Sequence, residues 1–89
     1  MGCTANVVIV TPEQIICGNL GDSRSILARI NGDVLPLSID HKPEDKEEID
    51  RIHKAGGYVA EMRVCGNLNL SRCLGDFTYK LNSDLSYKE

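Results

Sequence analysis

The chain carries two glycine–aspartate pairs that could do metal chemistry. Asp22 lies in Cys-Gly-Asn-Leu-Gly-Asp-Ser-Arg, residues 17–24, and Asp76 lies in Ser-Arg-Cys-Leu-Gly-Asp, residues 71–76. A glycine before the aspartate permits a tight turn at a strand end, where the carboxylate can bind Mg²⁺ or Mn²⁺. The alternative is that each carboxylate hydrogen-bonds its own turn or an ion partner. The residues alone favour the turn over the metal site for Asp22, and for Asp76 they favour a turn or a pairing with Arg72 or Arg24.

Other titratable side chains are weaker candidates for catalysis. His41, within Asp-His-Lys-Pro at residues 40–43, could serve as a general acid because histidine titrates near neutrality. No second catalytic group is evident beside it, so we expect a structural role for His41 and a helix-surface position for His53. Guanidinium groups match phosphate oxygens, but we expect the arginines to be structural ion partners or solvated residues. These arginines are Arg24, Arg51, Arg63 and Arg72.

Composition excludes several classes of function. The net charge is -3, from 13 acidic and 10 basic residues, and the basic residues are scattered instead of forming the clustered face that nucleic acid requires. The apolar runs are of strand length, so we expect no membrane span. The four cysteines form no Cys-x-x-Cys pair, which favours free thiols in a cytoplasmic or nuclear protein over a zinc site or disulfides.

The first forty residues predict an antiparallel β-meander. The β-branched run at 6–10 indicates a strand buried on both faces, and strands are expected to follow at 14–19, 23–30 and 34–37. Asn31-Gly32 predicts a type I′ hairpin turn, because that turn needs two residues with positive φ.

The remaining residues predict one helix and short strands. Residues 43–54 place acids early and bases late, with an apolar stripe of Ile49, Ile52 and Ala55 and a left-handed cap at Gly56. Strands are expected at 58–64 and 68–70, with a bend or short helical turn at 71–76, and the tail at 81–89 is polar. The fold class is therefore α+β, an antiparallel meander with one amphipathic helix.

The order of these motifs resembles a known family. Gly-Cys-Thr-Ala at 2–5, Gly-Asp-Ser-Arg at 21–24, Asp-His-Lys-Pro at 40–43, Ala-Gly-Gly at 55–57 and Ser-Arg-Cys-Leu-Gly-Asp at 71–76 follow one another as in the middle of the metal-dependent Ser/Thr protein phosphatases of type 2C. The resemblance implies that residues 1–89 are a central segment, truncated at both ends, of that family's α-β-β-α sandwich. It also implies that an apolar sheet face stays uncovered in this chain.

The resemblance has functional consequences. It implies hydrolysis of phosphoserine and phosphothreonine in phosphoprotein substrates with Mg²⁺ or Mn²⁺. Asp22 matches the aspartate that contributes to an additional, weaker metal site in the family, whereas no catalytic residue can be assigned. The main ligands come from an Asp-Gly-His-Gly motif and two later aspartates that this chain lacks. We therefore expect the isolated chain to be inactive. The alternatives are a non-catalytic pseudophosphatase remnant or protein-binding module, and an unrelated small α+β domain.

Overall fold

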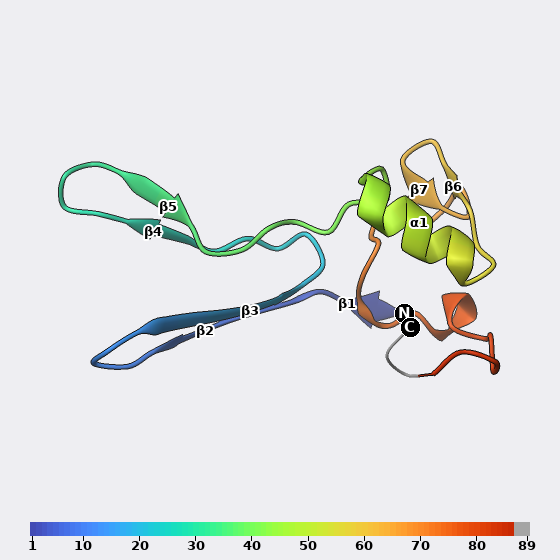
Figure 1. Cartoon of the computed structure of the whole chain (residues 1–89), viewed down its shortest axis with the longest axis horizontal. Coiled ribbons are helices and arrows are strands. Elements are labelled where there is room, and N and C mark those ends of the chain that lie inside the picture. The colour runs from blue at the N-terminus through green and yellow to red at the C-terminus, as the bar shows by residue number, and fades with distance from the viewer. Residues whose placement is uncertain (87–89) are drawn as a thin grey trace.

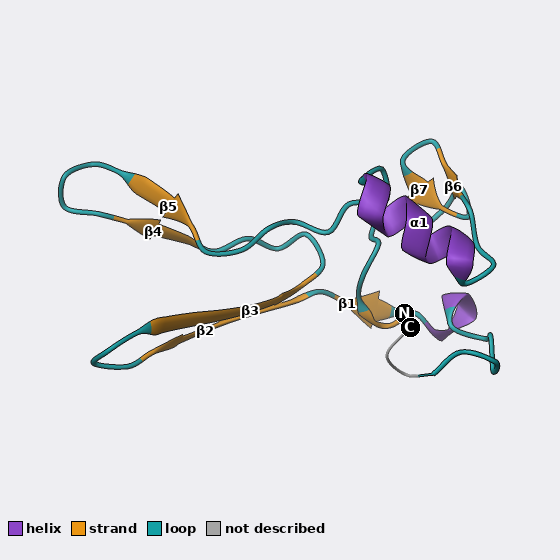
Figure 2. Ribbon diagram, viewed as in Figure 1, coloured by secondary structure: helices purple, strands orange, loops and turns teal. Residues whose placement is uncertain are grey.

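The computed structural model describes residues 1–86 and has the expected mixture of antiparallel strands and one helix (Figures 1 and 2). Residues 87–89, the end of the tail, lie outside the described part. The elements in chain order are β1 (Gly2–Cys3), β2 (Ala5–Val10), β3 (Ile15–Leu20), β4 (Ile26–Ala28), β5 (Val34–Pro36), α1 (Lys46–Lys54), β6 (Val59–Ala60), β7 (Arg63–Val64), β8 (Leu74–Gly75) and the 3₁₀ helix Phe77–Tyr79. The α+β fold class is confirmed.

Two hairpins form one half of the molecule. β2 pairs with β3 from Ala5 opposite Leu20 to Val10 opposite Ile15, and β4 pairs with β5. Figure 1 shows both hairpins extending in the same direction from the half that contains α1. Among the described residues the strands form four separate two-stranded sheets, so the meander is interrupted between β3 and β4.

The turn between β4 and β5 differs from the predicted type I′ geometry. Gly32 has φ +91°, but Asn31 does not adopt a positive φ. Gly32 N–H donates to the Arg29 carbonyl, and Arg29 N–H donates to the Asp33 carbonyl, which closes a three-residue loop. The Asn31 side chain accepts from Asp33 N–H at 3.0 Å, and this bond favours the loop over a two-residue turn.

Helix α1 begins at Lys46, later than the predicted start at residue 43. Asp45 N–H donates to the Lys42 carbonyl, so residues 42–45 form a separate turn, in which Pro43 is fully buried. The helix ends at Lys54, and Gly56, with φ +89°, forms the predicted left-handed cap, which two backbone bonds from Gly56 and Gly57 complete. Within residues 1–86, no helix is both long enough and apolar enough to cross a bilayer.

The predicted strand at 58–64 is a tight hairpin. Glu61 and Met62 have φ +53° and +59° and form the turn between β6 and β7, although neither is a glycine. The predicted strand at 68–70 reduces to one bridge between Leu68 and Val64.

The buried core is small and lies away from the two hairpins. Ile52, Val64 and Cys73 are its buried apolar residues. Val7, Ile9 and Val10 are 58%, 55% and 71% exposed, so the predicted burial of β2 on both faces is wrong for this chain, because no second layer among residues 1–86 packs against the hairpin. The expected uncovered apolar face is confirmed.

Candidate functional site

The turn at Gly21 and Asp22 is held by the segment Asp40–Lys42, which we call the 40–42 clasp. Gly21 N–H donates to His41 Nδ1 at 3.0 Å, and the Gly21 carbonyl accepts from His41 N–H at 2.9 Å. Gly21 is buried with φ +106°, and a Cβ at this position would lie 2.8 Å from Thr4 Cβ and 3.1 Å from the Arg72 carbonyl. Only glycine fits both the conformation and the space.

Two ion pairs flank this backbone pairing. Lys42 Nζ lies 2.6 Å from Asp22 Oδ2, and the side chains of these residues are 38% and 25% exposed. Arg24 donates to both carboxylate oxygens of Asp40, at 3.0 and 2.8 Å. The hydrogen bond from Arg24 lowers the pKa of Asp40, and the hydrogen bond to Asp22 raises the pKa of Lys42. The carboxylate of Asp22 is thus paired with a lysine.

An asparagine pair supports the same turn from strands β2 and β3. Asn6 Nδ2 donates to Asn19 Oδ1 at 2.9 Å, across directly paired positions. Asn19 Nδ2 also donates to the carbonyls of Ile39 and Gly21, at 2.8 and 3.2 Å. Sequence reasoning missed this pair, and its only signal was two amide residues within otherwise apolar strands.

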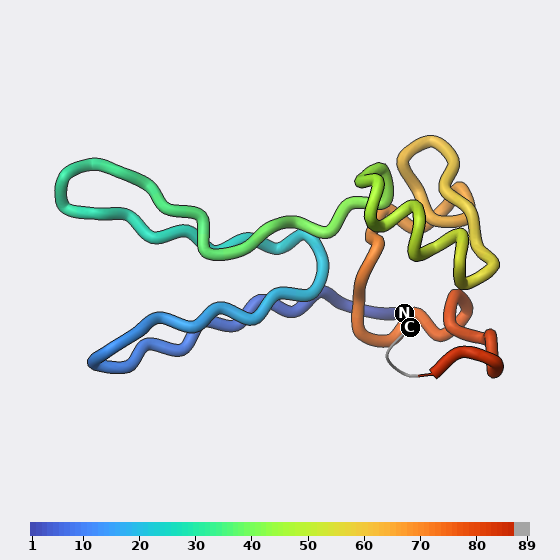
Figure 3. Tube along the Cα trace, viewed as in Figure 1, coloured from blue at the N-terminus to red at the C-terminus, as the bar shows by residue number. Residues whose placement is uncertain are grey.

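The second corner, at Gly75 and Asp76, packs against strand β1. Gly2 pairs with Gly75, and a Cβ at Gly2 would lie 2.5 Å from both Asp76 Cγ and the Leu74 carbonyl oxygen. Asp76 adopts φ +48°, and its N–H donates to the Met1 carbonyl at 3.0 Å. Figure 3 shows the blue N-terminal segment running beside the orange segment that contains β8.

The arginine partners predicted for Asp76 are engaged elsewhere. Arg72 bonds to Glu48, and Arg24 bonds to Asp40. Of the two alternatives predicted for Asp76, the pairing with Arg72 or Arg24 is therefore wrong, and the structure shows the turn. The carboxylate of Asp76 lies instead against Gly2.

Residues 2–4, which contain β1 and Thr4, connect the two corners. Gly2 contacts the Asp76 corner, while the methyl group of Thr4 packs on Gly21 and its hydroxyl lies 2.7 Å from Ser23 Oγ. The two glycine–aspartate pairs, separated by more than fifty residues of sequence, therefore pack at the two ends of one three-residue segment, residues 2–4.

A buried carboxylate ties helix α1 to the segment leading to Asp76. Glu48 is 4% exposed and accepts hydrogen bonds from Arg72 and Arg51, with shortest distances of 2.7 and 3.0 Å. Burial raises the pKa of Glu48, but the bonds from the two arginines outweigh burial and hold the pKa at about 2. The predicted structural roles of Arg24, Arg51 and Arg72 are confirmed. Arg63 donates to the Asn67 carbonyl at 2.8 Å.

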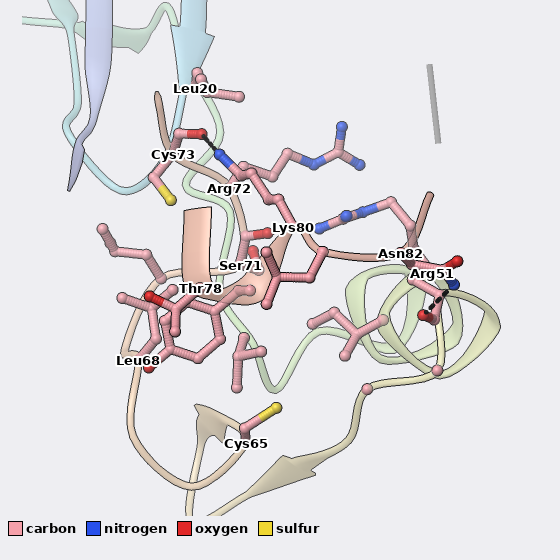
Figure 4. Close-up of a pocket in the computed structure, with 18 residues that line it drawn as sticks. Leu20, Arg51, Cys65, Leu68, Ser71, Arg72, Cys73, Thr78, Lys80 and Asn82 are labelled. Atoms are coloured by element: carbon pink, nitrogen blue, oxygen red, sulfur yellow. Dashed lines mark hydrogen bonds between the residues drawn. The ribbon is translucent and has the colours of Figure 1, made fainter. Parts of the chain in front are cut away.

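A cavity of about 520 Å³ opens between α1 and the segment after β8 (Figure 4). In Figure 4 the Lys80 ammonium reaches the Cys73 carbonyl, and Asn82 bonds to the Ala55 carbonyl. The described lining contains no carboxylate and no imidazole. The cavity thus offers no carboxylate to a hard divalent cation, and it lies beside the buried core residues Ile52, Val64 and Cys73. Its lining residues are Leu20, Arg51, Ile52, Ala55, Gly56, Gly57, Val64, Cys65, Leu68, Leu70, Ser71, Arg72, Cys73, Thr78, Tyr79, Lys80, Leu81 and Asn82.

The residues present do not form a metal centre by themselves. Within the described range, no three or more His, Cys, Asp or Glu side chains are grouped to hold a metal ion. Asp22 is paired with Lys42, and Asp40 is paired with Arg24. A divalent cation prefers six or more oxygen ligands, so one lysine-paired carboxylate is not a sufficient set.

Comparisons with known proteins agree on one family. The family described as "Protein phosphatase 2C" matches residues 1–88. "Protein phosphatase ppm-1.G" of Caenorhabditis elegans is 52% identical over 88 residues, which are 99% of this chain and 18% of that protein. "Probable protein phosphatase 2C 3" of Paramecium tetraurelia is 51% identical over 99% of this chain and 29% of that protein. This chain therefore spans less than a third of the length of these relatives.

A solved structure has the same fold. The crystal structure of a phosphatase from a pathogenic strain of Toxoplasma gondii matches with a TM-score of 0.78 and 44% sequence identity. The match covers 81% of this chain and 23% of that one. In that phosphatase the same arrangement is thus one part of a much longer polypeptide.

Proposed function

Because the chain belongs to the protein phosphatase 2C family, we propose that it forms part of a metal-dependent enzyme that hydrolyses phosphoserine and phosphothreonine in proteins. The observation that carries this proposal is the match over residues 1–88, together with the packing of both glycine–aspartate corners on residues 2–4. Since the chain spans 18% of one relative and 29% of another, the activity belongs to a polypeptide that supplies the remaining groups.

Asp22 is the residue of this chain that we propose to contribute to a site for Mg²⁺ or Mn²⁺. Asp22 lies two residues after the end of β3 and its side chain is 25% exposed, which leaves the carboxylate reachable by a cation held mainly by other ligands. Divalent ions in such sites activate a water molecule and neutralise phosphoryl oxygens. The 40–42 clasp, Thr4 and Asn19 have the separate task of fixing the turn that presents Asp22.

On this proposal, the chain has no hydrolytic activity by itself. The described residues supply one candidate ligand and no grouped donor set. The proposed substrates are phosphoproteins, and the four free thiols support an intracellular location.

A non-catalytic protein-binding role is the second candidate. The lysine-paired state of Asp22 and the exposed apolar side chains of β2 favour it. A chimera distinguishes the two functions: residues 1–88 replace the matching 88 residues of the C. elegans relative. The enzyme proposal predicts Mn²⁺-dependent hydrolysis of a phosphopeptide by this chimera.

The Asp22→Asn variant of the chimera should need a higher Mn²⁺ concentration for half-maximal rate. Asp50→Asn, at an exposed position of α1, is the matched control and should behave like the unsubstituted chimera. A folded chimera without activity would favour the binding role. Equal behaviour of both variants would remove Asp22 from the metal site.

A further inference from the structure

We propose that His41 is a positioning residue for Asp22, acting as the hydrogen-bond acceptor of Gly21 N–H through the unprotonated Nδ1 atom of its ring. The consequence for catalysis rests on the proposed function of Asp22. The hydrogen bonds between His41 and Gly21 do not depend on that proposed function, because they are made within this chain.

His41 holds Gly21 at both of its backbone polar groups. The ring accepts from Gly21 N–H at 3.0 Å, and the backbone N–H of His41 donates to the Gly21 carbonyl at 2.9 Å. Without the ring, the Gly21 N–H, in a buried residue, would lose its acceptor. His41 thus bonds to both backbone polar groups of the residue that precedes Asp22, and Asn19 Nδ2 also donates to the Gly21 carbonyl at 3.2 Å.

The neighbours of His41 hold the two charged residues of the same turn. Asp40 accepts from Arg24 with both oxygens, and Lys42 bonds to Asp22 at 2.6 Å. Three consecutive residues of the clasp thus engage three of the four residues at positions 21–24. The ion pairs are partly exposed and therefore weak, whereas the His41 bond satisfies a buried backbone group.

Two further residues pack against the turn at Gly21. The Thr4 side chain and the Arg72 carbonyl occupy the space where a Gly21 side chain would lie. Gly21 is thus held by hydrogen bonds to His41 and packs against the Thr4 side chain and the Arg72 carbonyl. The direction in which Asp22 leaves the turn is set by these contacts.

This role requires one tautomer of the imidazole. A nitrogen that accepts a hydrogen bond carries no proton, so the proton of neutral His41 lies on Nε2. His53, the only other histidine, is exposed on α1 and serves as an internal reference. The positioning role therefore has a spectroscopic signature that a space-filling role lacks.

Nitrogen NMR of the two imidazoles in the uniformly ¹⁵N-labelled chain tests the signature directly. We expect neutral His41 to be the Nε2–H tautomer, with Nδ1 shifted by its hydrogen bond relative to His53. An Nδ1–H tautomer at His41 would overturn the proposal. This measurement needs no substitution and so does not depend on any variant folding.

Two variants separate acceptor chemistry from packing. In His41→Asn the amide oxygen can occupy the place of Nδ1, whereas in His41→Gln the polar atoms lie farther from the backbone. We expect hydrogen exchange at the Gly21 amide to be about two- to tenfold faster in His41→Gln and unchanged in His41→Asn. The Asp22 amide shift should move only with the Gln variant.

His53→Gln is the control and should change neither amide. If His41→Asn and His41→Gln alter the Gly21 amide equally, or if neither does, the positioning role is overturned. These readouts involve no metal and no turnover. An inactive chimera with the expected tautomer would thus contradict the proposed function alone, and an active chimera with the opposite tautomer would contradict this inference alone.

Discussion

Arg72 and Glu48 form a charge pair at 2.7 Å in which the carboxylate is almost completely buried. Arg72 approaches from the segment that leads to Asp76, and Glu48 lies in the first turns of α1. Since Arg51 bonds to the same carboxylate, one buried acid fixes the helix against this segment. Removing this carboxylate should destabilise both α1 and the segment that leads to Asp76.

Replacing Glu48 with Gln should destabilise the fold by about 1–3 kcal/mol. The amide keeps the size of the side chain but leaves two partly buried guanidinium groups without their counter-charge. Urea unfolding followed by circular dichroism measures the change. Glu47→Gln, at the exposed neighbouring position, is the control and should cost less than about 0.5 kcal/mol. Equal costs at the two positions would contradict the role assigned to Glu48.

Acid should remove the contribution of Glu48. Its pKa is about 2 in the fold, against 4.5 as the ordinary value. A lowered pKa stabilises the fold fully above the ordinary value, and this stabilisation is lost as the pH falls from about 4.5 towards 2, with an upper limit of about 3 kcal/mol. Urea midpoints across this pH range should therefore decrease. The slope should be shallower in Glu48→Gln, and an unchanged slope would contradict the assignment.

Gly2→Ala should separate β1 from β8. The added Cβ would meet the Leu74 carbonyl and the Asp76 side chain, so the two strands must move apart. We expect a loss of about 1–3 kcal/mol in unfolding free energy and faster hydrogen exchange at the Asp76 amide. Gly18→Ala is the matched control, because no atom lies within 4 Å of its added Cβ. Similar losses in both variants would argue against the Gly2–Asp76 contact.

The exposed apolar side chains of β2 should cause self-association. Val7 and Ile9 project from the same face of the strand, and exposed apolar faces and edges favour pairing between chains. Light scattering should show a mass that rises with concentration, and the double variant Val7→Lys/Ile9→Lys should reduce it. Glu13→Lys, at the tip of the hairpin, controls for charge alone. A concentration-independent monomer with cooperative unfolding would contradict this prediction.

Local sequence signals predicted where helices and strands form better than they predicted how deeply those elements are buried. The β-branched run before Pro12 identified the first hairpin, and Gly56 identified the end of α1. The turn at Glu61 and Met62 was missed because neither residue usually adopts a positive φ. Burial of β2 was overestimated, because an apolar pattern reports which faces are suited to packing and not whether a second layer is present.

The site was predictable only in part. The two glycine–aspartate pairs were identified from local motifs, but the partners of the carboxylates were not. Lys42 is 20 residues from Asp22, and Arg72 is 24 residues from Glu48, so no local pattern relates them. The contact between His41 and Gly21 could not be predicted from a local pattern either, because it forms only when the chain returns to Gly21 after β5.

The most direct test of the account is a turnover assay of the isolated chain on a phosphopeptide with Mn²⁺, with the chimera as positive control. We propose that this chain presents Asp22 but depends on ligands supplied by a longer polypeptide. This proposal therefore predicts no phosphate release by the isolated chain above a blank containing only the metal, and clear release by the chimera. Metal-dependent turnover by the isolated 89-residue chain would contradict it.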